Sequence, residues 1–234
     1  AGLDAAAVGI LDRFRTGTAE LEVTQIGKEC HGNGCAIFRE SGRCVMPAEG
    51  IFCRVLTGGL TRPGDVLEHA PHLLRARVIT LSDRAHAGVY EDLSGPRLAI
   101  LLEEFLASRR FHPSVERILL PDDPASLRAA LEAARTEGFD LVFTTGGTGI
   151  GPRDHAPEVV AAACSRLIPG IMESIRSRFG AEHPAALLSR AVAGVAGTTL
   201  VFTLPGSVRA VEEYSGEIFR VLEHAIRMVR GMGH

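Results

Sequence analysis

The chain of 234 residues has no long apolar run, no excess of basic residues and almost no lysine. No apolar stretch reaches the roughly 18 residues that a membrane-spanning helix needs, and the N-terminus lacks the charged and apolar segments of a signal peptide. A formal net charge of −3 provides no general attraction to nucleic acid. These absences predict a cytoplasmic protein without a membrane or nucleic acid partner.

Lysine occurs once, at Lys28, and neither Gly-Lys-Ser nor Gly-Lys-Thr is present. In a P-loop this lysine contacts the terminal phosphates of the nucleotide, so a standard P-loop kinase is excluded. The five cysteines are an odd number, and four of them lie between Cys30 and Cys53, which is not the spread of a disulfide framework. The chain starts at Ala1 and not at methionine, as a processed or truncated chain would.

Composition and length indicate a globular chain with more than one unit. Hydrophobic residues make up 46% and charged residues 23%, which is enough for a sizeable core. The length suits a domain of about 150 residues plus a smaller one. Residues 18–69 have the pattern of short strands and Gly or Pro turns, with strand candidates at 21–26 and 51–56. We therefore predict a small all-β domain at residues 1–72 and a second domain at residues 73–234.

Strands and helices alternate from Arg77 onward, which favours a mostly parallel sheet covered on both faces. We therefore predict a three-layer α/β/α fold for the second domain. In such a sheet, ligands bind at the carboxyl ends of the strands. The strands expected in it span residues 78–81, 115–120, 141–143 and 199–204.

Three helices of this domain have caps or apolar stripes of helical spacing. The first is expected to have Ser94 as its N-cap, and the second runs from an Asp123 cap to Gly138. The predicted buried face of the first helix is Leu98, Leu101, Leu102, Phe105 and Leu106. That of the second is Leu127, Ala130, Leu131 and Ala134. The third is the last helix of the chain, with a predicted buried face of Ile218, Val221, Leu222, Ala225 and Val229.

A glycine-rich loop at residues 144–154 reads Thr-Thr-Gly-Gly-Thr-Gly-Ile-Gly-Pro-Arg-Asp and follows directly on a predicted strand. Its glycines free the backbone for left-handed conformations and let the N–H groups approach an anion. Arg153 adds a cation, and Asp154 adds a carboxylate that suits a metal ion. A plain strand-to-helix turn would leave these polar side chains unexplained, so the loop predicts a phosphate site.

Carboxylates at the same strand ends would repel a phosphate unless a divalent cation stood between them. Mg²⁺ bound by one or two carboxylates and by substrate phosphates is the usual arrangement. Asp123 precedes Pro124 and is interpreted as a helix cap, which leaves Asp122 as the functional candidate. Asp154 has two interpretations, either a metal ligand or the cap of the helix that contains Pro157. These residues predict a metal–nucleotide site.

Several motifs follow one another in a fixed order along residues 73–231. They are Ile79-Thr80-Leu81-Ser82-Asp83-Arg84, the segment 88–96, Leu120-Pro121-Asp122, the loop 144–154 with Pro157-Glu158, Leu188-Ser189-Arg190, and Leu204-Pro205-Gly206. In this combination the chain resembles the molybdopterin adenylyltransferases, a family that includes the G domain of gephyrin. Motifs in a fixed order are far more specific than any one of them alone.

The resemblance implies Mg-ATP-dependent adenylylation of molybdopterin, with release of pyrophosphate, in molybdenum cofactor biosynthesis. It implies that Asp122 and Asp154 hold Mg²⁺ and orient the phosphates. The implied nucleotide cradle is Gly146, Gly147, Thr148 and Gly149. The implied contacts to the pterin or its phosphate are Thr80, Ser82, Ser189 and Ser207, and Pro205 and Gly206 complete the predicted substrate set.

Two of these serines have a second interpretation, because Ser82 and Ser207 could also cap helices or turns. The resemblance further implies a homo-oligomer, generally a trimer in this family. Proteins that insert molybdenum or transfer sulfur are the candidate protein partners.

The N-terminal unit resembles the C-terminal half of a MOSC domain, a β-barrel associated with the molybdenum cofactor. The resemblance rests on segments 21–31, 35–38, 44–47, 50–52 and 62–65. The other half, including an expected Gly-Asp-x-His type motif, is missing, so the expected unit is a partial barrel.

The cysteines of this unit have more than one interpretation. Cys30, His31, Cys35 and Cys44 could bind zinc, but their spacing matches no common zinc ribbon. Cys30 or Cys44 could instead carry sulfur or contact a cofactor. Cys53 and Cys164 are interpreted as core residues.

Two other functions stay open on the sequence. The chain could be a carrier or scaffold that binds molybdopterin or the molybdenum cofactor without catalysis. It could also be an unrelated sugar-nucleotide or phosphate-sugar enzyme on a similar sheet, which ligand preference among pterins and sugars would distinguish.

Overall fold

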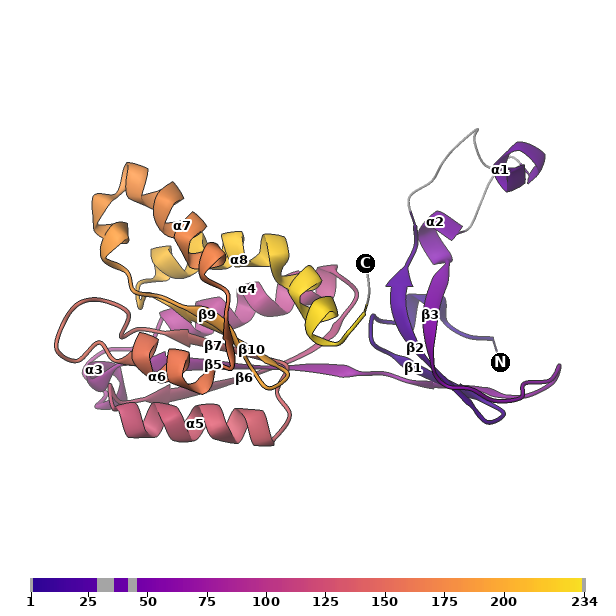
Figure 1. Cartoon of the computed structure of the whole chain (residues 1–234), viewed down its shortest axis with the longest axis horizontal. Helices are drawn as coiled ribbons and strands as arrows, with labels where there is room; N and C mark the ends of the chain where they lie inside the picture. The colour runs from indigo at the N-terminus through magenta and orange to yellow at the C-terminus, as the bar shows by residue number, and fades with distance from the viewer. Residues whose placement is uncertain (1, 29–35, 42–45, 233–234) are drawn as a thin grey trace. The chain divides into compact units, whose positions relative to one another are not determined.

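The computed structural model describes residues 2–28, 36–41 and 46–232. It divides into two compact units (Figure 1). The first consists of Ala1–Leu73 and Leu106–His112, and the second of Leu74–Phe105 and Pro113–His234. Within the described part of the chain, no helix combines the length and apolar character that crossing a membrane requires.

The first unit contains a four-stranded antiparallel sheet with the strand order β3-β2-β1-β4. The strands are β1 (Arg13–Thr16), β2 (Ala19–Ile26), β3 (Ile51–Thr57) and β4 (Leu67–Ala70). Gly17 closes the turn between β1 and β2 with a φ of +56°, a left-handed conformation that suits glycine. Short helices that the strand pattern did not predict add to this unit: η1 (Ala5–Ala7), α1 (Ala36–Ser41) and α2 (Met46–Glu49).

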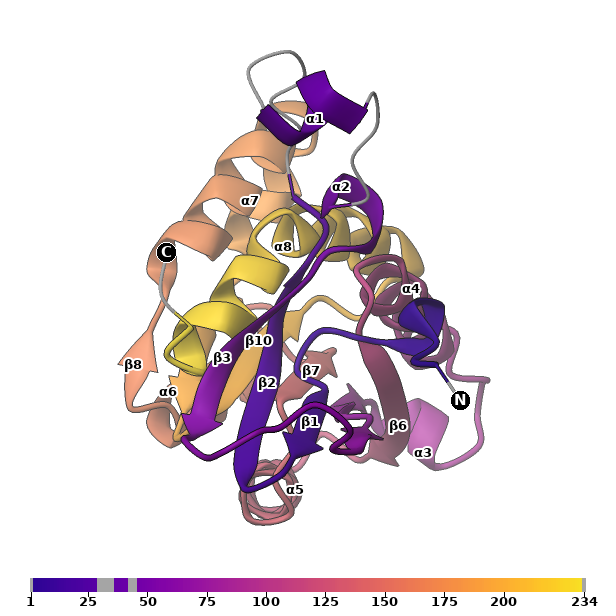
Figure 2. The ribbon, with the colours of Figure 1, turned by 90° about the vertical axis from the view of Figure 1, so that its right-hand side faces the viewer.

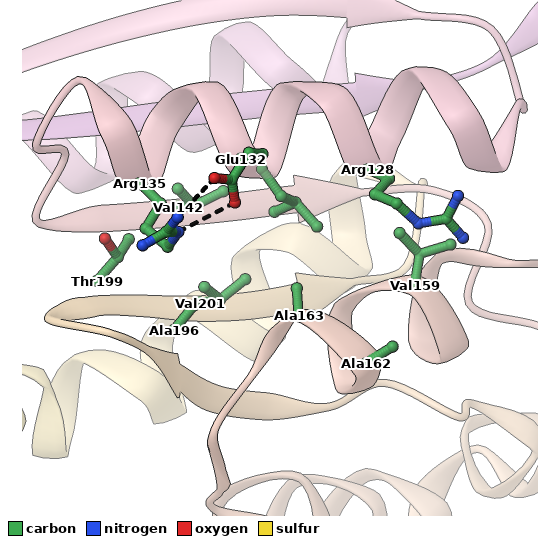
Figure 3. Close-up of a pocket in the computed structure, with 11 residues that line it drawn as sticks. Arg128, Glu132, Arg135, Val142, Val159, Ala162, Ala163, Ala196, Thr199 and Val201 are labelled. Carbon is green, nitrogen blue, oxygen red and sulfur yellow. Dashed lines mark hydrogen bonds and ion pairs between the residues drawn. The ribbon is translucent and has the colours of Figure 1, made fainter.

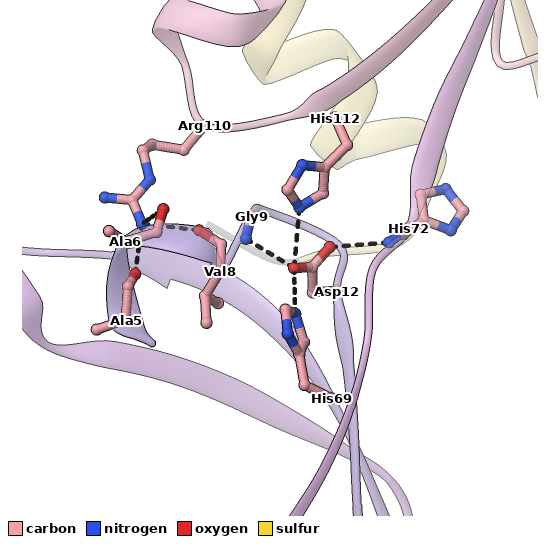
Figure 4. A network of polar contacts seen from close by, with 9 residues as sticks. All are labelled: Ala5, Ala6, Val8, Gly9, Asp12, His69, His72, Arg110 and His112. Carbon is pink, nitrogen blue, oxygen red and sulfur yellow. Dashed lines mark hydrogen bonds and ion pairs between the residues drawn. The ribbon is translucent and has the colours of Figure 1, made fainter. Parts of the chain in front are cut away.

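A buried carboxylate ties the chain segments of the first unit together (Figure 4). Asp12 accepts hydrogen bonds from the backbone N–H groups of Gly9 at 2.7 Å and His72 at 2.8 Å. The Nε2 atoms of His69 and His112 lie 2.6 and 3.1 Å from the same carboxylate. Burial alone would raise the pKa of Asp12, but these hydrogen bonds outweigh it and hold the pKa below its ordinary value.

The second unit is built on a six-stranded sheet with the order β6-β5-β7-β10-β9-β8. Strands β5, β7 and β10 are parallel, while β9 runs antiparallel to β10 and β8 antiparallel to β9. The strands are β5 (Leu73–Leu81), β6 (His112–Leu120), β7 (Leu141–Thr145), β8 (Arg166–Leu167), β9 (Ala193–Ala196) and β10 (Thr199–Leu204).

Helices cover both faces of this sheet, with α5 and α6 on one face and α4 and α8 on the other (Figure 1, Figure 2). The helices are α3 (Asp83–His86), α4 (Ser94–Ser108), α5 (Pro124–Thr136), α6 (Ala156–Ala163), α7 (Pro169–Glu182), η3 (Pro184–Leu188) and α8 (Val208–Val229). The core under α5 and α6 includes Leu127, Leu131, Val142, Val160 and Val201, all almost fully buried. The predicted three-layer α/β/α fold with a mostly parallel sheet is confirmed.

The caps of two helices differ in how well the sequence predicted them. The Asp123 carboxylate caps α5 and accepts from the Ser126 N–H at 2.7 Å, as predicted. Ser94, predicted as an N-cap, is instead the first residue of α4. The backbone N–H of Gly95 donates a hydrogen bond to a carboxylate oxygen of Asp92 at 3.0 Å. A carboxylate two residues before the helix therefore takes the place of the predicted hydroxyl.

The buried face of α8 is only partly the predicted one. Val221 is exposed, and the buried apolar residues follow the spacing of Ile218, Leu222 and Ile226. Neighbouring residues on a helix point about 100° apart, so a stripe through Leu222 turns Val221 toward solvent.

The two cysteines that the structure describes, Cys53 and Cys164, differ in how well their predicted burial agrees with the structure. Cys53 is exposed in β3, most of which is exposed toward its C-terminal end, so its prediction as a core residue was wrong. Cys164 packs against the core under α5 and α6, and burial raises the pKa of its thiol to about 11.

Candidate functional site

The parallel strands of the second unit end side by side. Thr80 of β5 and Leu204 of β10 both pair with Thr145 of β7, so the segments that follow them meet at one edge of the sheet. Gly146 is the point of closest approach. Its N–H donates to the Leu204 carbonyl at 3.0 Å, and a Cβ at this position would lie 2.3 Å from the Leu81 carbonyl. Glycine is required here both for space and for a φ of +101°.

Three adjoining hollows lie at this edge. The first is lined by Asp122, Arg153 and Gly147, and the second extends from Gly147 to Gly206. The third begins at Gly206, so the middle hollow shares a lining residue with each of its neighbours. The middle hollow is the largest of the three, at about 330 Å³.

Nearly all the predicted site residues line these hollows. Those of the first are Asp122 and Gly147; those of the second are Gly147, Thr148, Gly149, Asp154, Ser189, Pro205 and Gly206; and those of the third are Thr80, Ser82, Gly206 and Ser207. Gly146 lines none of the three, and its contribution is the close contact with Leu81. The predicted residues therefore lie together at one edge of the sheet.

Asp122 is held by a reciprocal pair of hydrogen bonds with Asp83. The N–H of Asp83 donates to Asp122 Oδ2, and the N–H of Asp122 donates to Asp83 Oδ1, each at 3.0 Å. The other oxygen of Asp83 forms an ion pair with Arg153 from the glycine loop. Asp83 therefore links two sides of the first hollow.

Asp154 does not cap the following helix, because His155 occupies that position and makes no capping hydrogen bond with its side chain. Instead, Asp154 Oδ2 accepts from the Gly151 N–H at 2.8 Å and closes the turn of the loop. The alternative interpretation of Asp154 as a helix cap is thus wrong.

Arg190 fixes the loop from the outside. Its Nε donates to the Gly149 carbonyl at 2.7 Å, Nη2 donates to the Asp154 carbonyl at 2.5 Å, and its N–H donates to the Thr148 carbonyl at 2.9 Å. Its guanidinium also pairs with Glu158. The sequence showed Arg190 only as part of a motif, and its contacts extend from Thr148 in the loop to Glu158 in α6.

The predicted hydroxyl groups have partners inside the protein. Ser82 caps α3 by accepting from the Ala85 N–H, and Ser207 caps α8 by accepting from the Ala210 N–H, both at 3.2 Å. The interpretation of both serines as caps is therefore confirmed. The Thr80 hydroxyl donates to Asp92 Oδ2 at 2.7 Å.

Asp122 and Asp154 have the donor oxygens that Mg²⁺ prefers, and they line adjoining hollows. Each candidate carboxylate uses Oδ2 for a backbone hydrogen bond, and no hydrogen bond to Oδ1 is seen within the described residues. Among those residues, no three His, Cys, Asp or Glu side chains are arranged to hold a metal by themselves. Mg²⁺ needs only one or two carboxylates when phosphates and water complete its shell. The zinc candidates Cys30, His31, Cys35 and Cys44 lie outside the described residues.

Sequence reasoning missed part of the middle hollow. Glu213 and Tyr214 of α8 and the η3 residues Ala185 and Ala186 line it beside Ser189. Tyr214 is buried, and burial raises the pKa of its phenol. The only signal was that α8 starts directly after the Pro205-Gly206 motif, which places its first two turns at this edge.

Comparisons with known proteins agree with the geometry. Residues 77–224 match the family described as "Probable molybdopterin binding domain". The chain is 36% identical over 159 residues to the molybdenum cofactor biosynthesis bifunctional protein of Synechococcus elongatus, covering 68% of this chain and 48% of the relative. The chain thus spans about half the length of the first curated relatives it matches.

Shorter relatives are covered more fully. Molybdopterin adenylyltransferase of Helicobacter pylori J99 is 34% identical, over 66% of this chain and 86% of that protein. The solved structure of the molybdopterin biosynthesis enzyme MoaB from Thermus thermophilus is 36% identical, with a TM-score of 0.60 over 68% of this chain and 97% of that chain. A structure of MogA is 39% identical, with a TM-score of 0.60, over 66% of this chain and 99% of that chain. The chain belongs to the molybdopterin-binding domain family.

Proposed function

We propose that the chain is a molybdopterin adenylyltransferase of molybdenum cofactor biosynthesis. The main support is that the predicted carboxylates, glycine loop and hydroxyl groups line three adjoining hollows at the ends of β5, β7 and β10. Relatives named molybdopterin adenylyltransferase, 34% to 38% identical, support the same activity.

In the proposed reaction, an oxygen of the terminal phosphate of molybdopterin attacks the α-phosphorus of ATP. The new bond joins that oxygen to the α-phosphorus, and the bond between the α-phosphorus and the bridging oxygen to the β-phosphate breaks. Pyrophosphate leaves with that oxygen, and adenylyl-molybdopterin is formed. Such a transfer depends on positioning and on neutralisation of phosphate charge.

The glycine loop would bind the nucleotide through its backbone. Gly147, Thr148 and Gly149 line the middle hollow, where N–H groups of a glycine-rich turn suit an anion. The carbonyls of Thr148 and Gly149 already accept hydrogen bonds from Arg190, and these hydrogen bonds fix the orientation of the two peptide groups. The loop is thus ordered before the nucleotide arrives, which reduces the entropy cost of binding.

Asp122 and Asp154 would hold Mg²⁺ through the carboxylate oxygens that accept no backbone hydrogen bond. When bound, Mg²⁺ neutralises charge on the phosphates. Thr80, Ser82, Ser189 and Ser207 would contact the pterin or its phosphate. Ser82 and Ser207 also cap α3 and α8, which holds both hydroxyls in place. Ser207 still has a proton to donate, whereas the Ser82 hydroxyl shares a hydrogen bond with the Tyr90 hydroxyl at 2.7 Å.

We also propose a homotrimer, a cytoplasmic location and a partial MOSC-like identity for the first unit, as the resemblance implies. Proteins that insert molybdenum or transfer sulfur remain the proposed partners. Native mass determination would test the trimer, and a monomer at working concentration would contradict it.

The activity is tested by incubating the full chain with molybdopterin, ATP and Mg²⁺ and following adenylylated product and pyrophosphate. The proposal expects both products in equal amounts. Tight pterin binding without either product would identify a carrier instead, and binding of sugar phosphates in preference to pterins would favour the sugar-nucleotide alternative.

A further inference from the structure

A groove in the second unit shares no lining residue with the three hollows. One of its walls is α5, and the facing wall is formed by the end of α6 with β9 and β10 (Figure 3). Its volume is about 170 Å³, which limits a ligand to one small, slender molecule. We propose that this groove binds a small organic anion with an apolar body and a single carboxylate.

The floor and lower wall of the groove are apolar. Val142, Val159 and Val201 belong to the core of this unit and are almost fully buried, yet their side chains reach the groove. Ala163 and Ala196 form the lower wall, where larger side chains would fill the space. An apolar ligand body would remove this surface from water, at about 25 cal/mol for each Å² buried.

The upper wall carries the charge. Arg128, Glu132 and Arg135 follow one another at helical spacing along the groove side of α5 (Figure 3). Glu132 accepts from Arg135 at 3.0 Å through Nε and at 2.5 Å through Nη2, so these two charges neutralise each other. Arg128 makes no hydrogen bond or ion pair within the described part of the chain. The groove therefore presents one positive charge to a ligand.

The carboxylate that caps the N-terminus of α5 is already in use. Asp123 accepts from the backbone N–H and the hydroxyl of Ser126, both at 2.7 Å. Arg128 still lowers the pKa of Asp123 through its charge, after the larger effect of these hydrogen bonds, but the two side chains form no ion pair. A carboxylate at the Arg128 end would thus gain a partner without displacing one.

The size of the groove selects the probe. The wall from Arg128 to Arg135 extends about 10 Å along α5 at 1.5 Å per residue. A medium-chain fatty acid anion such as octanoate has an apolar body of comparable length with the carboxylate at one end. Octanoate is therefore the test ligand, and 1-octanol is the uncharged control.

Isothermal titration of the full chain with octanoate is expected to show saturable binding at one site per chain and much weaker binding of 1-octanol. Arg128→Gln should weaken octanoate binding about tenfold, the effect of about 1.4 kcal/mol for one partly shielded charge pair. Arg117→Gln removes an exposed arginine of β6 outside the groove and should leave binding unchanged.

Ala163→Leu and Ala162→Leu each add volume at the lower wall, and both positions are exposed, so the fold should tolerate them. Either variant should abolish octanoate binding while retaining the circular dichroism spectrum and adenylyl transfer of the parent chain. Absence of saturable binding in the parent chain, or unchanged binding in both leucine variants, would overturn the proposal. A lower native mass in these variants would also overturn it, because the groove would then be a contact between copies.

Discussion

Asp83 and Asp122 bind each other through reciprocal hydrogen bonds, the backbone N–H of each donating to the carboxylate of the other at 3.0 Å. This pair joins the end of β5 to the end of β6, and the ion pair of Asp83 with Arg153 extends it to the glycine loop. The position of the proposed metal ligand Asp122 therefore depends on a second carboxylate.

Asp83→Ala should lower the rate of adenylyl transfer about tenfold to a hundredfold, because Asp122 and Arg153 lose their shared partner. Asp83→Asn keeps an oxygen that accepts from Asp122, so its loss should be smaller. Steady-state rates at saturating ATP and molybdopterin measure both effects. Equal rates in the parent chain and Asp83→Ala would show that this link does not position the site.

Asp154→Asn should abolish turnover while molybdopterin still binds. The amide is almost the same size and can still accept from Gly151, but it carries no charge for the metal. A loss of at least a hundredfold is expected, on the scale of one transition-state charge contact. Pterin binding by fluorescence and product formation are measured on the same sample. An unaltered rate would refute the metal role of Asp154.

Arg190→Lys should retain the folded state but slow the reaction about tenfold, because lysine lacks the planar fork that reaches two loop carbonyls. The affinity for ATP should fall with the rate, since the loop is the proposed nucleotide cradle. Arg97→Lys is the control, as Arg97 pairs with Glu212 outside the hollows. Equal effects of the two substitutions would contradict a specific role for Arg190.

Gly146→Ala should destabilise the second unit by roughly 2 kcal/mol or more, because of its positive φ and the contact with Leu81. Gly216→Ala is the matched control within α8, where a Cβ meets no neighbour and alanine favours the helix. Urea denaturation should show a lower midpoint for the first variant and a slightly higher one for the second. Similar midpoints for the two variants would mean that the backbone around Gly146 accommodates a Cβ without loss of stability.

Low pH should lower the free energy of unfolding of the first unit, because Asp12 becomes protonated. Its pKa is lowered in the folded state, so its contribution is present above the ordinary pKa near 3.8 and is lost as the pH falls through the folded value. Asp12→Asn should cost about 1.5 to 3 kcal/mol near neutral pH, the range for hydrogen bonds to a charged group. Denaturation at several pH values should show the two proteins converging below about pH 4. A difference that stays constant with pH would exclude the carboxylate charge as its source.

The sequence predicted the layers and the site edge because both depend on local patterns. The apolar run from Val78 to Leu81 and the Thr199–Leu204 segment have the length and β-branched content of buried strands, and the motifs lie directly after them. The contacts of Asp83 and Arg190 could not be predicted, because they join residues 39 and 41 positions apart through loop conformations. Glu213 and Tyr214 were missed because a stripe of helix residues does not reveal which turn faces a hollow.

Adenylyl transfer can be followed by giving the full chain molybdopterin, Mg²⁺ and ATP labelled either at the α-phosphate or at the γ-phosphate. We expect the α label to move to the pterin fraction and the γ label to leave as pyrophosphate, and we expect neither with Asp154→Asn. Transfer of the γ label to the pterin, or no transfer of either label while the pterin is bound, would contradict adenylyl transfer.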